Sequence, residues 1–417
     1  MNEAPDPSGH RRFWKAVCGL GLSQILAWGC IYYPVSVTGP HIAHDLGLSQ
    51  GAVYGAYSVL LLASAVVARA IGRAIDVRGG RPILVAGCVV AAAALLATAG
   101  ATGVVSYLAC NLLLGVAAAM TLYDAAFPAA VEAAHPQGRR AIALVTFAGG
   151  FASTVCWPVT AFLVAHGGWR MTYVIYAFVM VLICLPVNWL ALERRRTGDT
   201  RTSDMAPAPV LADAPILTGR MRARALLLLG STVAINQVVV SGFVIHVIDF
   251  SQAIGIGTTE AIGLGMLFGP AQVLGRVGEM AFGKRFSAVM TGRIATACLP
   301  LSLLCVLPGH TTLPLAILFV LALGLSNGLM TIARGTVALA LFGPAGYGAT
   351  MGKLTVPTLV ARAAGPFVFT LAIDALGVRA TIVIGLALGL LACLGMEMVA
   401  STEREIRQAP EPVLPQK

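Results

Sequence analysis

Residues 112–131 read LLLGVAAAMTLYDAAFPAAV, a run of twenty residues in which Asp124 carries the single charge. About 20 apolar residues cross the hydrocarbon core of a bilayer as a helix. A charge at the bilayer centre costs roughly 2.5–3.5 kcal/mol on insertion scales, and it normally faces a protein or water-filled interior. The stretch therefore predicts a transmembrane helix whose one carboxylate has a function.

The composition places the rest of the chain in a membrane as well. Of its 417 residues, 58% are hydrophobic and 11% are charged, and the mean hydropathy is +0.84. A soluble domain carries about a quarter charged residues, so we expect a multi-pass membrane protein. The polar start Met1–His10 and the long first apolar segment argue against a cleaved signal peptide. The nine cysteines show neither metal-binding nor disulfide spacing, and we expect no metal and no cofactor.

Segments of membrane-spanning length recur along the chain, and one long polar linker, residues 193–224, divides them six plus six. We therefore expect an all-α membrane protein of twelve transmembrane helices in two pseudo-symmetric six-helix bundles. The bundles are residues 1–192 and 225–417, the latter including a tail. The predicted spans are 13–38, 51–75, 82–100, 104–134, 141–166, 170–192, 225–250, 259–282, 288–307, 312–341, 349–374 and 379–400.

The basic residues indicate which side of the membrane holds the termini. On this map they gather in the start, the linker, the tail and the turns on the same side, whereas only Arg170 and Arg379 lie in turns on the other side. Because cytoplasmic loops carry an excess of Lys and Arg, both termini are predicted to be cytoplasmic, in a bacterial-type inner (plasma) membrane. The net charge of +10 thus reflects topology, and we expect no nucleic-acid partner.

The two halves also resemble each other at a fixed interval of 209 residues. GGWRMTYVIYAFV, from Gly167, and LGVRATIVIGLAL, from Leu376, look like one helix start written twice. Repeated halves around a central pathway are typical of secondary transporters. The pairs at this interval are Gly115 with Gly324, Gly168 with Gly377 and Arg170 with Arg379.

The turn between the second and third spans reads GRAIDVRGGRP, residues 72–82. This turn resembles the signature loop of the major facilitator superfamily, in which Gly72, Asp76, Gly79 and Arg81 match, while Val77 replaces the usual arginine and Arg78 follows it. The resemblance implies the major facilitator fold and a gating role for the loop. Asp76 would cap the positive N-terminus of the eleventh helix when the cytoplasmic side is closed. Arg78 or Arg81 would pair with Glu132 at the end of the fourth span; alternatively, these charges only set topology.

Within the superfamily, the eighth and eleventh spans are similar to the oxalate/formate and monocarboxylate branch. The fifth span lacks the GP-x-x-GG pattern of drug:proton antiporters and contains Trp157-Pro158 instead. In the branch that it resembles, basic side chains on these two helices hold the substrate carboxylate, and Arg276 and Arg362 are the matching positions. Arg276 could instead be a structural counterpart of Arg69 near the cytoplasmic surface.

Asp124 and Arg334 are 210 residues apart, almost the repeat interval, and occupy corresponding turns of the fourth and tenth spans. They could pair when the inner side closes, as a gate that breaks on opening. Asp124 could also carry the coupling proton, because burial disfavours a charged carboxylate, or the two could form a static buried pair. Arg362 lies near the middle of its span and is the best candidate for an anion-binding residue. Polar residues predicted to line the substrate site with Arg362, Arg276 and Arg334 are Gln24, Tyr32, Tyr33, Tyr123, Asn236, Gln237 and Asn327, although each could simply make an interhelical hydrogen bond.

The sequence favours a proton-coupled carrier of a small, monocarboxylate-like organic anion, working by alternating access as a monomer in the lipid bilayer. The alternative is an importer or exporter of a neutral or aromatic metabolite or drug, with the membrane arginines structural. An enzyme is disfavoured because the spans contain no His, Asp and Glu grouping with ligand spacing, and a channel because two repeated halves do not form a ring of like filters.

Overall fold

The structure is a computed structural model that describes residues 7–193, 217, 219–246, 250–251, 255–283, 285–307 and 311–408. Within these ranges the regular structure is helical and no strand occurs. Nine described stretches are long and apolar enough to cross a membrane, and Ala288–Leu304 is a shorter apolar helix. The predicted all-α membrane class is therefore confirmed. Most of the predicted linker, residues 194–216 and 218, lies outside the described residues.

Every predicted span has a helical counterpart, although several spans are broken into shorter helices. The first half contains α1 (Pro7–Ala27), the π-helical turn η1 (Trp28–Tyr32), α2 (Val35–Asp45), α3 (Gln50–Arg78), α4 (Gly80–Ala99), α5 (Val104–Thr121), α6 (Tyr123–Ala133), α7 (Gly138–Gly150), α8 (Ala152–Val179), η2 (Met180–Cys184) and α9 (Leu185–Ala191). The second half contains α10 (Gly219–Ile245), α12 (Thr258–Phe282), α13 (Ala288–Leu304), α14 (Leu313–Phe342), α15 (Tyr347–Leu376) and α16 (Val378–Gln408).

The breaks have identifiable local causes, which the continuous predicted spans did not include. In the first span, the π-helical turn η1 is followed by Pro34, which has no N–H for the helical hydrogen-bond ladder. In the fourth span, Leu122 is extended (φ −82°, ψ −168°), so that α6 begins anew at Tyr123. The fifth and sixth spans form one bent stretch, 138–191, with the sharpest turn at Gly168, where φ is +72°. A left-handed backbone of this kind favours glycine.

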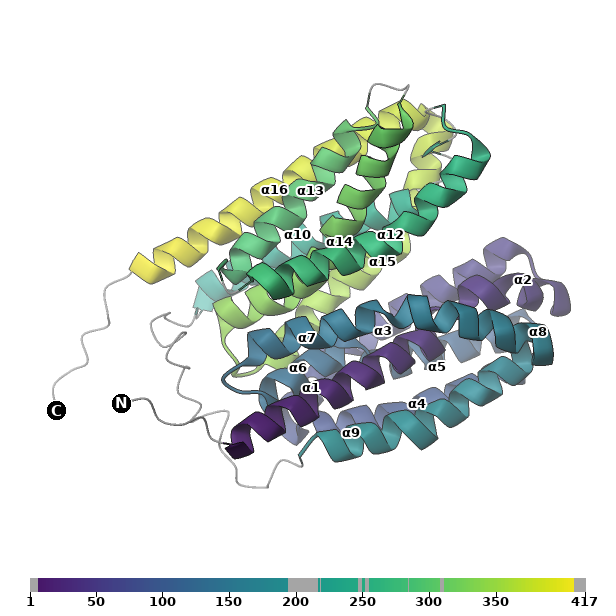
Figure 1. The fold of residues 1–417 in the computed structure, drawn as a ribbon, viewed down its shortest axis with the longest axis horizontal. Coiled ribbons are helices and arrows are strands. Elements are labelled where there is room, and N and C mark those ends of the chain that lie inside the picture. The colour runs from purple at the N-terminus through teal and green to yellow at the C-terminus, as the bar shows by residue number, and fades with distance from the viewer. Residues whose placement is uncertain are drawn as a thin grey trace.

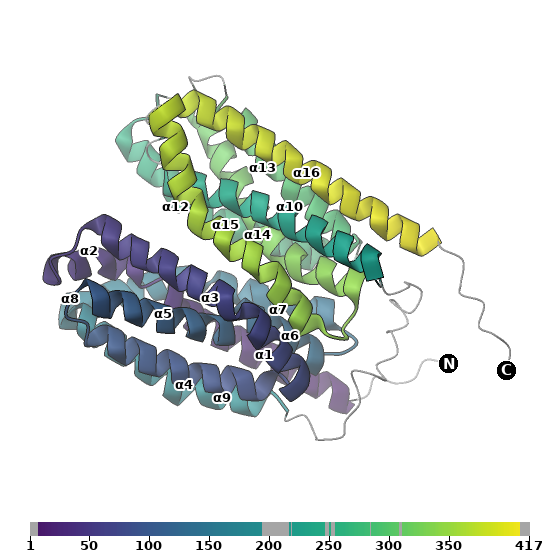
Figure 2. The same ribbon diagram turned by 180° about the vertical axis from the view of Figure 1, so that it is seen from behind.

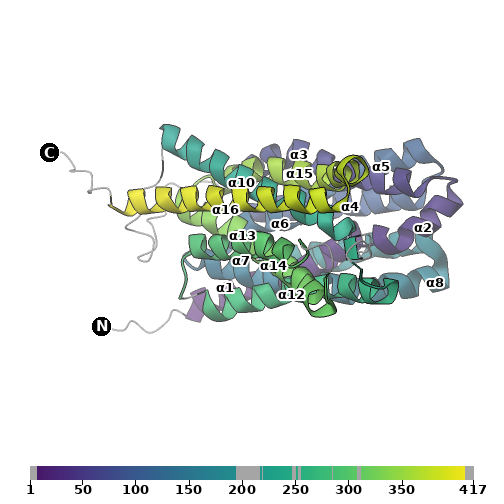
Figure 3. The ribbon, with the colours of Figure 1, turned by 90° about the horizontal axis from the view of Figure 1, so that it is seen from above.

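The helices form two groups, α1–α9 and α10–α16, which Figure 1 shows as separate purple-to-blue and green-to-yellow bundles. Figure 3 shows that α16 ends at the side where α1 begins, and we call this side the termini end. In the view from behind, α15 lies along α3 at the junction of the two bundles (Figure 2). The two bundles meet mainly through α15 with α3 and through α12 with α7.

The repeat found in the sequence is also a repeat in packing. A Cβ atom on Gly115 of α5 would collide with the backbone of Leu60 in α3, and one on Gly324 of α14 would collide with the backbone of Phe268 in α12. Both glycines therefore allow the fourth predicted span of a bundle to pack closely against the second. Gly168 and Gly377 share one left-handed conformation, with φ of +72° and +81°.

Glycines also hold the two bundles together near the termini end. Gly72 of α3 lies directly against the backbone of Gly348, and Gly352 lies against the backbone of Ala68. Gly348 and Gly352 are four residues apart on α15, so they form a small-residue stripe that lets α3 and α15 approach closely.

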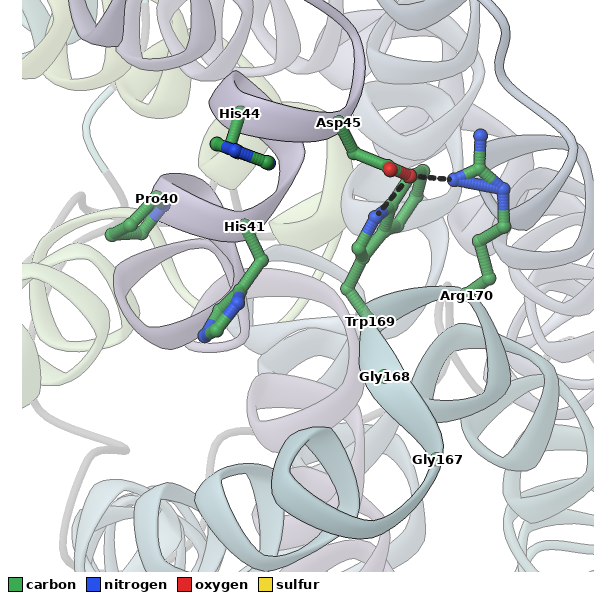
Figure 4. A pocket seen from close by; sticks show the side chains of 8 residues that line it. All are labelled: Pro40, His41, His44, Asp45, Gly167, Gly168, Trp169 and Arg170. Atoms are coloured by element: carbon green, nitrogen blue, oxygen red, sulfur yellow. Dashed lines mark hydrogen bonds and ion pairs between the residues drawn. The ribbon is translucent and has the colours of Figure 1, made fainter.

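At the opposite end, Asp45 joins the end of α2 to the bend in α8 (Figure 4). Its Oδ2 atom accepts hydrogen bonds from Trp169 Nε1 at 3.0 Å and from Arg170 Nη1 at 2.6 Å. These residues, with His41 and His44, line a pocket of about 420 Å³ that is formed by the first bundle alone. Arg170 also donates to the backbone of Ala101, in the turn between α4 and α5. It therefore ties the bend at Gly168, one of the repeated positions, to a neighbouring turn.

We expect the termini end to face the cytoplasm. A cysteine at Arg78, which is exposed at the end of α3, should react with a membrane-impermeant maleimide only after the membrane is opened. A cysteine at exposed His44, at the other end, should react in intact cells. Both variants need the exposed native cysteine Cys18 replaced by serine. The reverse labelling pattern would place the termini outside.

Candidate functional site

The charge in the opening stretch, Asp124, has an ion-pair partner in the other bundle. Its Oδ1 atom lies 2.8 Å from Nη2 of Arg334 on α14, and the two side chains are 15% and 9% exposed. Thr355 of α15 donates to the same Oδ1 at 2.6 Å and also accepts from Arg334 Nη1 at 3.3 Å. The sequence predicted the pair, whereas Thr355 was missed because a threonine in an apolar helix gives no signal.

The break at Leu122 explains how the membrane interior accommodates this carboxylate. Because α6 starts at Tyr123, Asp124 lies in the first turn of a helix. A helix N-terminus carries a partial positive charge that stabilises a nearby anion by about 0.3–1 kcal/mol. Asp124 is thus stabilised by a helix N-terminus, a guanidinium and a hydroxyl, and the last two belong to the other bundle.

Arg362 lies midway along α15 and is held by neutral partners. Its Nε and Nη2 atoms donate to Oε1 of Gln237 on α10 at 3.2 and 3.0 Å. Its Nη1 atom donates to the hydroxyl of Tyr32 in η1 at 3.4 Å, across the two bundles. No carboxylate within the described ranges forms an ion pair with Arg362. The arginine therefore keeps its positive charge uncompensated at mid-membrane.

The Gln237 side chain continues a polar chain through the second bundle. Its Nε2 atom donates to Oδ1 of Asn327 on α14 at 3.2 Å, and Asn327 Nδ2 donates to Oε1 of Gln272 on α12 at 2.8 Å. Each amide thereby orients the next, and the chain fixes the oxygen of Gln237 toward Arg362. Gln237 and Asn327 were predicted site residues, but Gln272 was not, because no feature of the sequence places α12 beside them.

Aromatic rings gather on the first-bundle side of Arg362. Tyr32 contacts Trp28 and Tyr57 with ring centroids 4.7 and 5.1 Å apart, and Trp28 contacts Tyr123 at 5.1 Å. Tyr33 lies beside Tyr32, with ring centroids 5.5 Å apart. The predicted tyrosines of the first and fourth spans are thus brought together. Trp28, whose buried Nε1 has no hydrogen-bond partner within the described residues, was missed.

Arg276 of α12 is a second arginine without a described ion-pair partner. It is 7% exposed, and its Nε atom is buried without a hydrogen-bond partner in the described part of the chain. Its Nη1 atom packs against Gly150 at the end of α7, and the guanidinium is close enough to Tyr33 and Tyr123 to act on them electrostatically. Arg276 therefore lies close to the same aromatic group as Arg362.

Two predicted substrate-site residues point elsewhere. Asn236 is fully buried and donates to Ser326 at 3.1 Å, which in turn bonds to the backbone of Ala295. Gln24 donates to the carbonyl of Thr121 at 2.8 Å and so ties α1 to the end of α5. Their contacts are interhelical hydrogen bonds, the alternative that the sequence left open for each of them. The Oε1 atom of Gln24 is buried without a described hydrogen-bond partner.

The loop at residues 72–82 makes the contact that its resemblance implies. Asp76 accepts hydrogen bonds from the backbone N–H groups of Gly348 and Ala349, both at 2.7 Å, at the N-terminus of α15. Glu132 accepts from the backbone N–H of Gly80 at 3.0 Å, at the start of α4. The guanidinium of Arg81 lies 4.0 Å above the ring of Trp189, and Arg78 is exposed.

A second inter-bundle contact at the termini end was not predicted. Arg139, near the start of α7, donates to Oε1 of Glu279 on α12 at 3.0 Å and to the backbone of Phe286 at 2.8 Å. Thr291 donates to the other oxygen of Glu279 at 2.7 Å. Glu279 follows Gly275 by four residues, as Asp76 follows Gly72. This glycine-to-acid spacing was the available signal, although the two acids are 203 residues apart and not at the repeat interval of 209.

The described residues contain no group of three or more His, Cys, Asp or Glu side chains that could hold a metal ion. Within that part of the chain, the candidate site therefore consists of an arginine-centred polar chain, an aromatic group and the Asp124–Arg334 pair.

Comparisons with known proteins agree on the architecture. A sequence model described as Major Facilitator Superfamily matches residues 20–286. The crystal structure of the human organic anion transporter MFSD10 (TETRAN) has a TM-score of 0.72 and 17% identity, and the match covers 94% of this chain and 100% of that one. The structure of FucP in the outward conformation has a TM-score of 0.68 and 14% identity, with coverage of 96% and 100%. At these identities the similarity concerns the fold. No curated protein sequence matches the chain.

We expect Asp76→Asn to loosen the termini end. The substitution keeps the size of the side chain but removes the charge at the helix N-terminus, an interaction of about 0.3–1 kcal/mol. Hydrogen–deuterium exchange in a peptide spanning residues 343–352 should rise up to about fivefold. Gly72→Ala should act in the same direction, because its Cβ would meet the backbone of Gly348.

The matched control is Asp374→Asn, the same substitution at an exposed position near the other end of α15. It should leave exchange in the 343–352 peptide unchanged. Equal exchange in the wild-type protein and Asp76→Asn would show that the carboxylate does not hold the two bundles together.

Proposed function

Because the chain belongs to the major facilitator superfamily, we propose that it is a secondary active transporter of a small, monocarboxylate-like organic anion, coupled to protons. Its membership makes it a membrane transporter rather than an enzyme. The anionic substrate, the proton and the residues below are our proposal. We further propose a monomer in a bacterial-type inner membrane, with cytoplasmic termini.

The observation that carries the proposal is the set of hydrogen bonds made by Arg362. It makes three described hydrogen bonds, two to the neutral amide oxygen of Gln237 and one to the hydroxyl of Tyr32. A charge in the membrane interior normally pairs with an opposite charge or marks a substrate pathway. Since no described carboxylate pairs with Arg362, a substrate carboxylate would supply the missing negative charge. It would bind in the two-pronged geometry that a guanidinium favours.

The surroundings of Arg362 favour a substrate with an apolar body. The guanidinium of Arg362 lies 6.0 Å from the ring centroid of Tyr32, and Tyr57 and Trp28 pack against that ring. Aromatic rings of this kind bind planar or apolar groups. Arg276, which is close enough to Tyr33 to act on it electrostatically, supplies a second positive field that attracts an anion to the same region. The similarity in fold to a protein named as an organic anion transporter agrees with this assignment but does not carry it.

Proton coupling would use the pair of Asp124 and Arg334. A proton on Asp124 would neutralise the carboxylate and remove its attraction for Arg334 in the other bundle. The pair and Thr355 connect the two bundles on the termini side of Arg362. Loss of the pair would therefore favour separation of the bundles at the termini end. Protonation and opening would thus be linked through one residue.

Alternating access would follow from relative motion of the two bundles, residues 1–192 and 225–417, about the site. Residues 193–224 would link them, and their last part, 219–224, forms the first turns of α10. The structure is closed at the termini end by Asp76 and by the Arg139–Glu279 pair. With cytoplasmic termini this would be the outward-facing side of the cycle. Opening the other way would break these contacts together with the Asp124 pair.

A neutral or aromatic substrate is the alternative, and the Gln237–Asn327–Gln272 chain favours it. These amides provide donors and acceptors suited to an uncharged ligand. Under this alternative, Arg362 would be structural and would only tie α15 to α10 and η1.

The anion proposal is tested by supplying Arg362 with a carboxylate from within the protein. Gln237→Glu places an acid 3.0–3.2 Å from two guanidinium nitrogens, so it should compete with the substrate. Arg362→Gln should weaken anion binding by roughly 30-fold or more, because losing a partner of a buried charge pair costs about 2 kcal/mol or more. Arg362→Lys should keep part of the binding. A screen of organic acids by thermal shift identifies the ligand, and calorimetry measures its affinity.

The control is Asn236→Asp, which adds the same charge one residue away, where the side chain faces Ser326. It should leave anion affinity within a few-fold of the wild type. Undiminished anion binding by both Gln237→Glu and Arg362→Gln would favour the neutral-substrate alternative.

The coupling proposal is tested by Asp124→Asn, which mimics the protonated carboxylate. In proteoliposomes this variant should lose accumulation driven by a proton gradient, yet retain exchange of substrate for substrate. Asp124→Glu keeps an ionisable group and should retain part of the driven uptake. Full gradient-driven uptake by Asp124→Asn would remove this residue from the coupling mechanism.

A further inference from the structure

A groove on the membrane-facing surface of the second bundle is separate from the site around Arg362. It lies between α10 and α15, holds about 660 Å³, and is lined along α10 from Gly219 to Ile235. With 1.5 Å per helical residue, this lining extends for about 24 Å. Leu227, on its wall, is 73% exposed, and Ser231 is exposed as well. A large exposed apolar side chain on a membrane-spanning helix faces lipid.

Small residues and a proline form the groove. Gly230 is buried, and a Cβ there would lie 3.6 Å from side-chain atoms of Leu354 and Pro357, so the floor is the contact between the two helices. Ser231 turns its hydroxyl back to the carbonyls of Leu227 and Leu228. The wall therefore presents an apolar surface to its occupant over most of its length.

Positive charge is concentrated at one end of this groove. Arg222 and Lys353 line it at the termini end, and Arg220 and Arg224 are exposed on the same first turns of α10. Arg222 is positioned by Thr350, whose hydroxyl accepts from Nη2 at 3.0 Å, and by the ring of Phe342. Lys353 is exposed and makes no ion pair with a described carboxylate. Among the described residues that line the groove, none is acidic.

The dimensions match one lipid molecule. From Arg222 to Ile235 the helix rises about 20 Å, which spans a headgroup and one leaflet of a hydrocarbon core that is about 30 Å thick. Lys353, six residues into α15, can extend its ammonium group toward the interface. The charged end would meet the headgroup, and the apolar wall would meet an acyl chain.

We propose that this groove binds an anionic phospholipid from the leaflet on the side of the termini, with its phosphate between Arg222 and Lys353. Basic pockets between transmembrane helices are known to hold anionic headgroups. The site is distinct from the proposed transport site, since neither Arg362 nor its partners line the groove.

The test titrates the purified full-length protein with phosphatidylglycerol or with phosphatidylcholine of the same acyl chains, and reads binding by native mass spectrometry. Phosphatidylglycerol should bind at least about fivefold more tightly, since each basic residue near the surface contributes about 1 kcal/mol. Lys353→Gln should lower its affinity about fivefold, and Lys353→Arg should not. Ser231→Leu, which fills the groove without changing charge, should weaken binding of both lipids.

The matched control is Arg285→Gln, which removes one exposed positive charge from the same bundle, in the turn after α12 and outside the groove. It should leave binding of phosphatidylglycerol unchanged. Soluble glycerophosphoglycerol should fail to displace the lipid. Equal binding of the two lipids, an equal effect of Arg285→Gln and Lys353→Gln, unaltered binding by Ser231→Leu, or displacement by the soluble headgroup would each overturn the proposal.

Discussion

The hydrocarbon core of a membrane offers no water to a charge, and this constraint determines where the polar residues of the chain can lie. Asp124 is tolerated there because a helix begins at Tyr123 and because Arg334 and Thr355 face it from the other bundle. Each of these partners depends on the two bundles being together. The interactions that stabilise the Asp124 carboxylate would therefore be lost if the bundles separated. The closed termini end and the buried ion pair belong to one conformation.

Arg362 meets the same constraint in another way. It has no described carboxylate partner and is held by the amide of Gln237 and the hydroxyl of Tyr32. Neutral acceptors orient a guanidinium without cancelling its charge, so the positive field stays available to a ligand. The amide chain behind Gln237 fixes the direction of that acceptor and limits the reorganisation that binding requires. The second bundle therefore holds one arginine that is joined to an acid of the first bundle, Arg334, and one that has no described acid partner, Arg362.

Composition and apolar length were sufficient to predict the membrane class and the positions of the spans, because a helix needs about 20 apolar residues to cross the bilayer. The Asp124–Arg334 pair followed from the repeat interval, since duplicated halves place corresponding turns opposite each other. The break at Leu122 and the partner Thr355 could not be predicted: an extended residue in an apolar run changes no hydropathy, and threonine is common on helix faces. Asn236 and Gln237 show the same limit, because adjacent amides on one helix differ by about 100° in direction, and only packing decides which one faces Arg362.

The two contacts that close the termini end differ in the groups that they require: one needs backbone N–H groups, and the other needs a second charged side chain. Asp76 binds backbone N–H groups, which every residue except proline provides, so the chemistry of this contact depends on a single side chain. The contact of Glu279 needs the guanidinium of Arg139 at the same time, so two positions in different halves must be kept together. Mutational tolerance is therefore unequal between the two contacts. Any residue except proline can donate at position 349, whereas a Cβ atom at Gly348 would meet both the backbone oxygen of Gly72 and the carboxylate of Asp76. In the other contact, a change at Arg139 leaves Glu279 with the hydroxyl of Thr291 but without its described counter-charge, and a change at Glu279 leaves Arg139 with the backbone of Phe286 but without its described counter-charge.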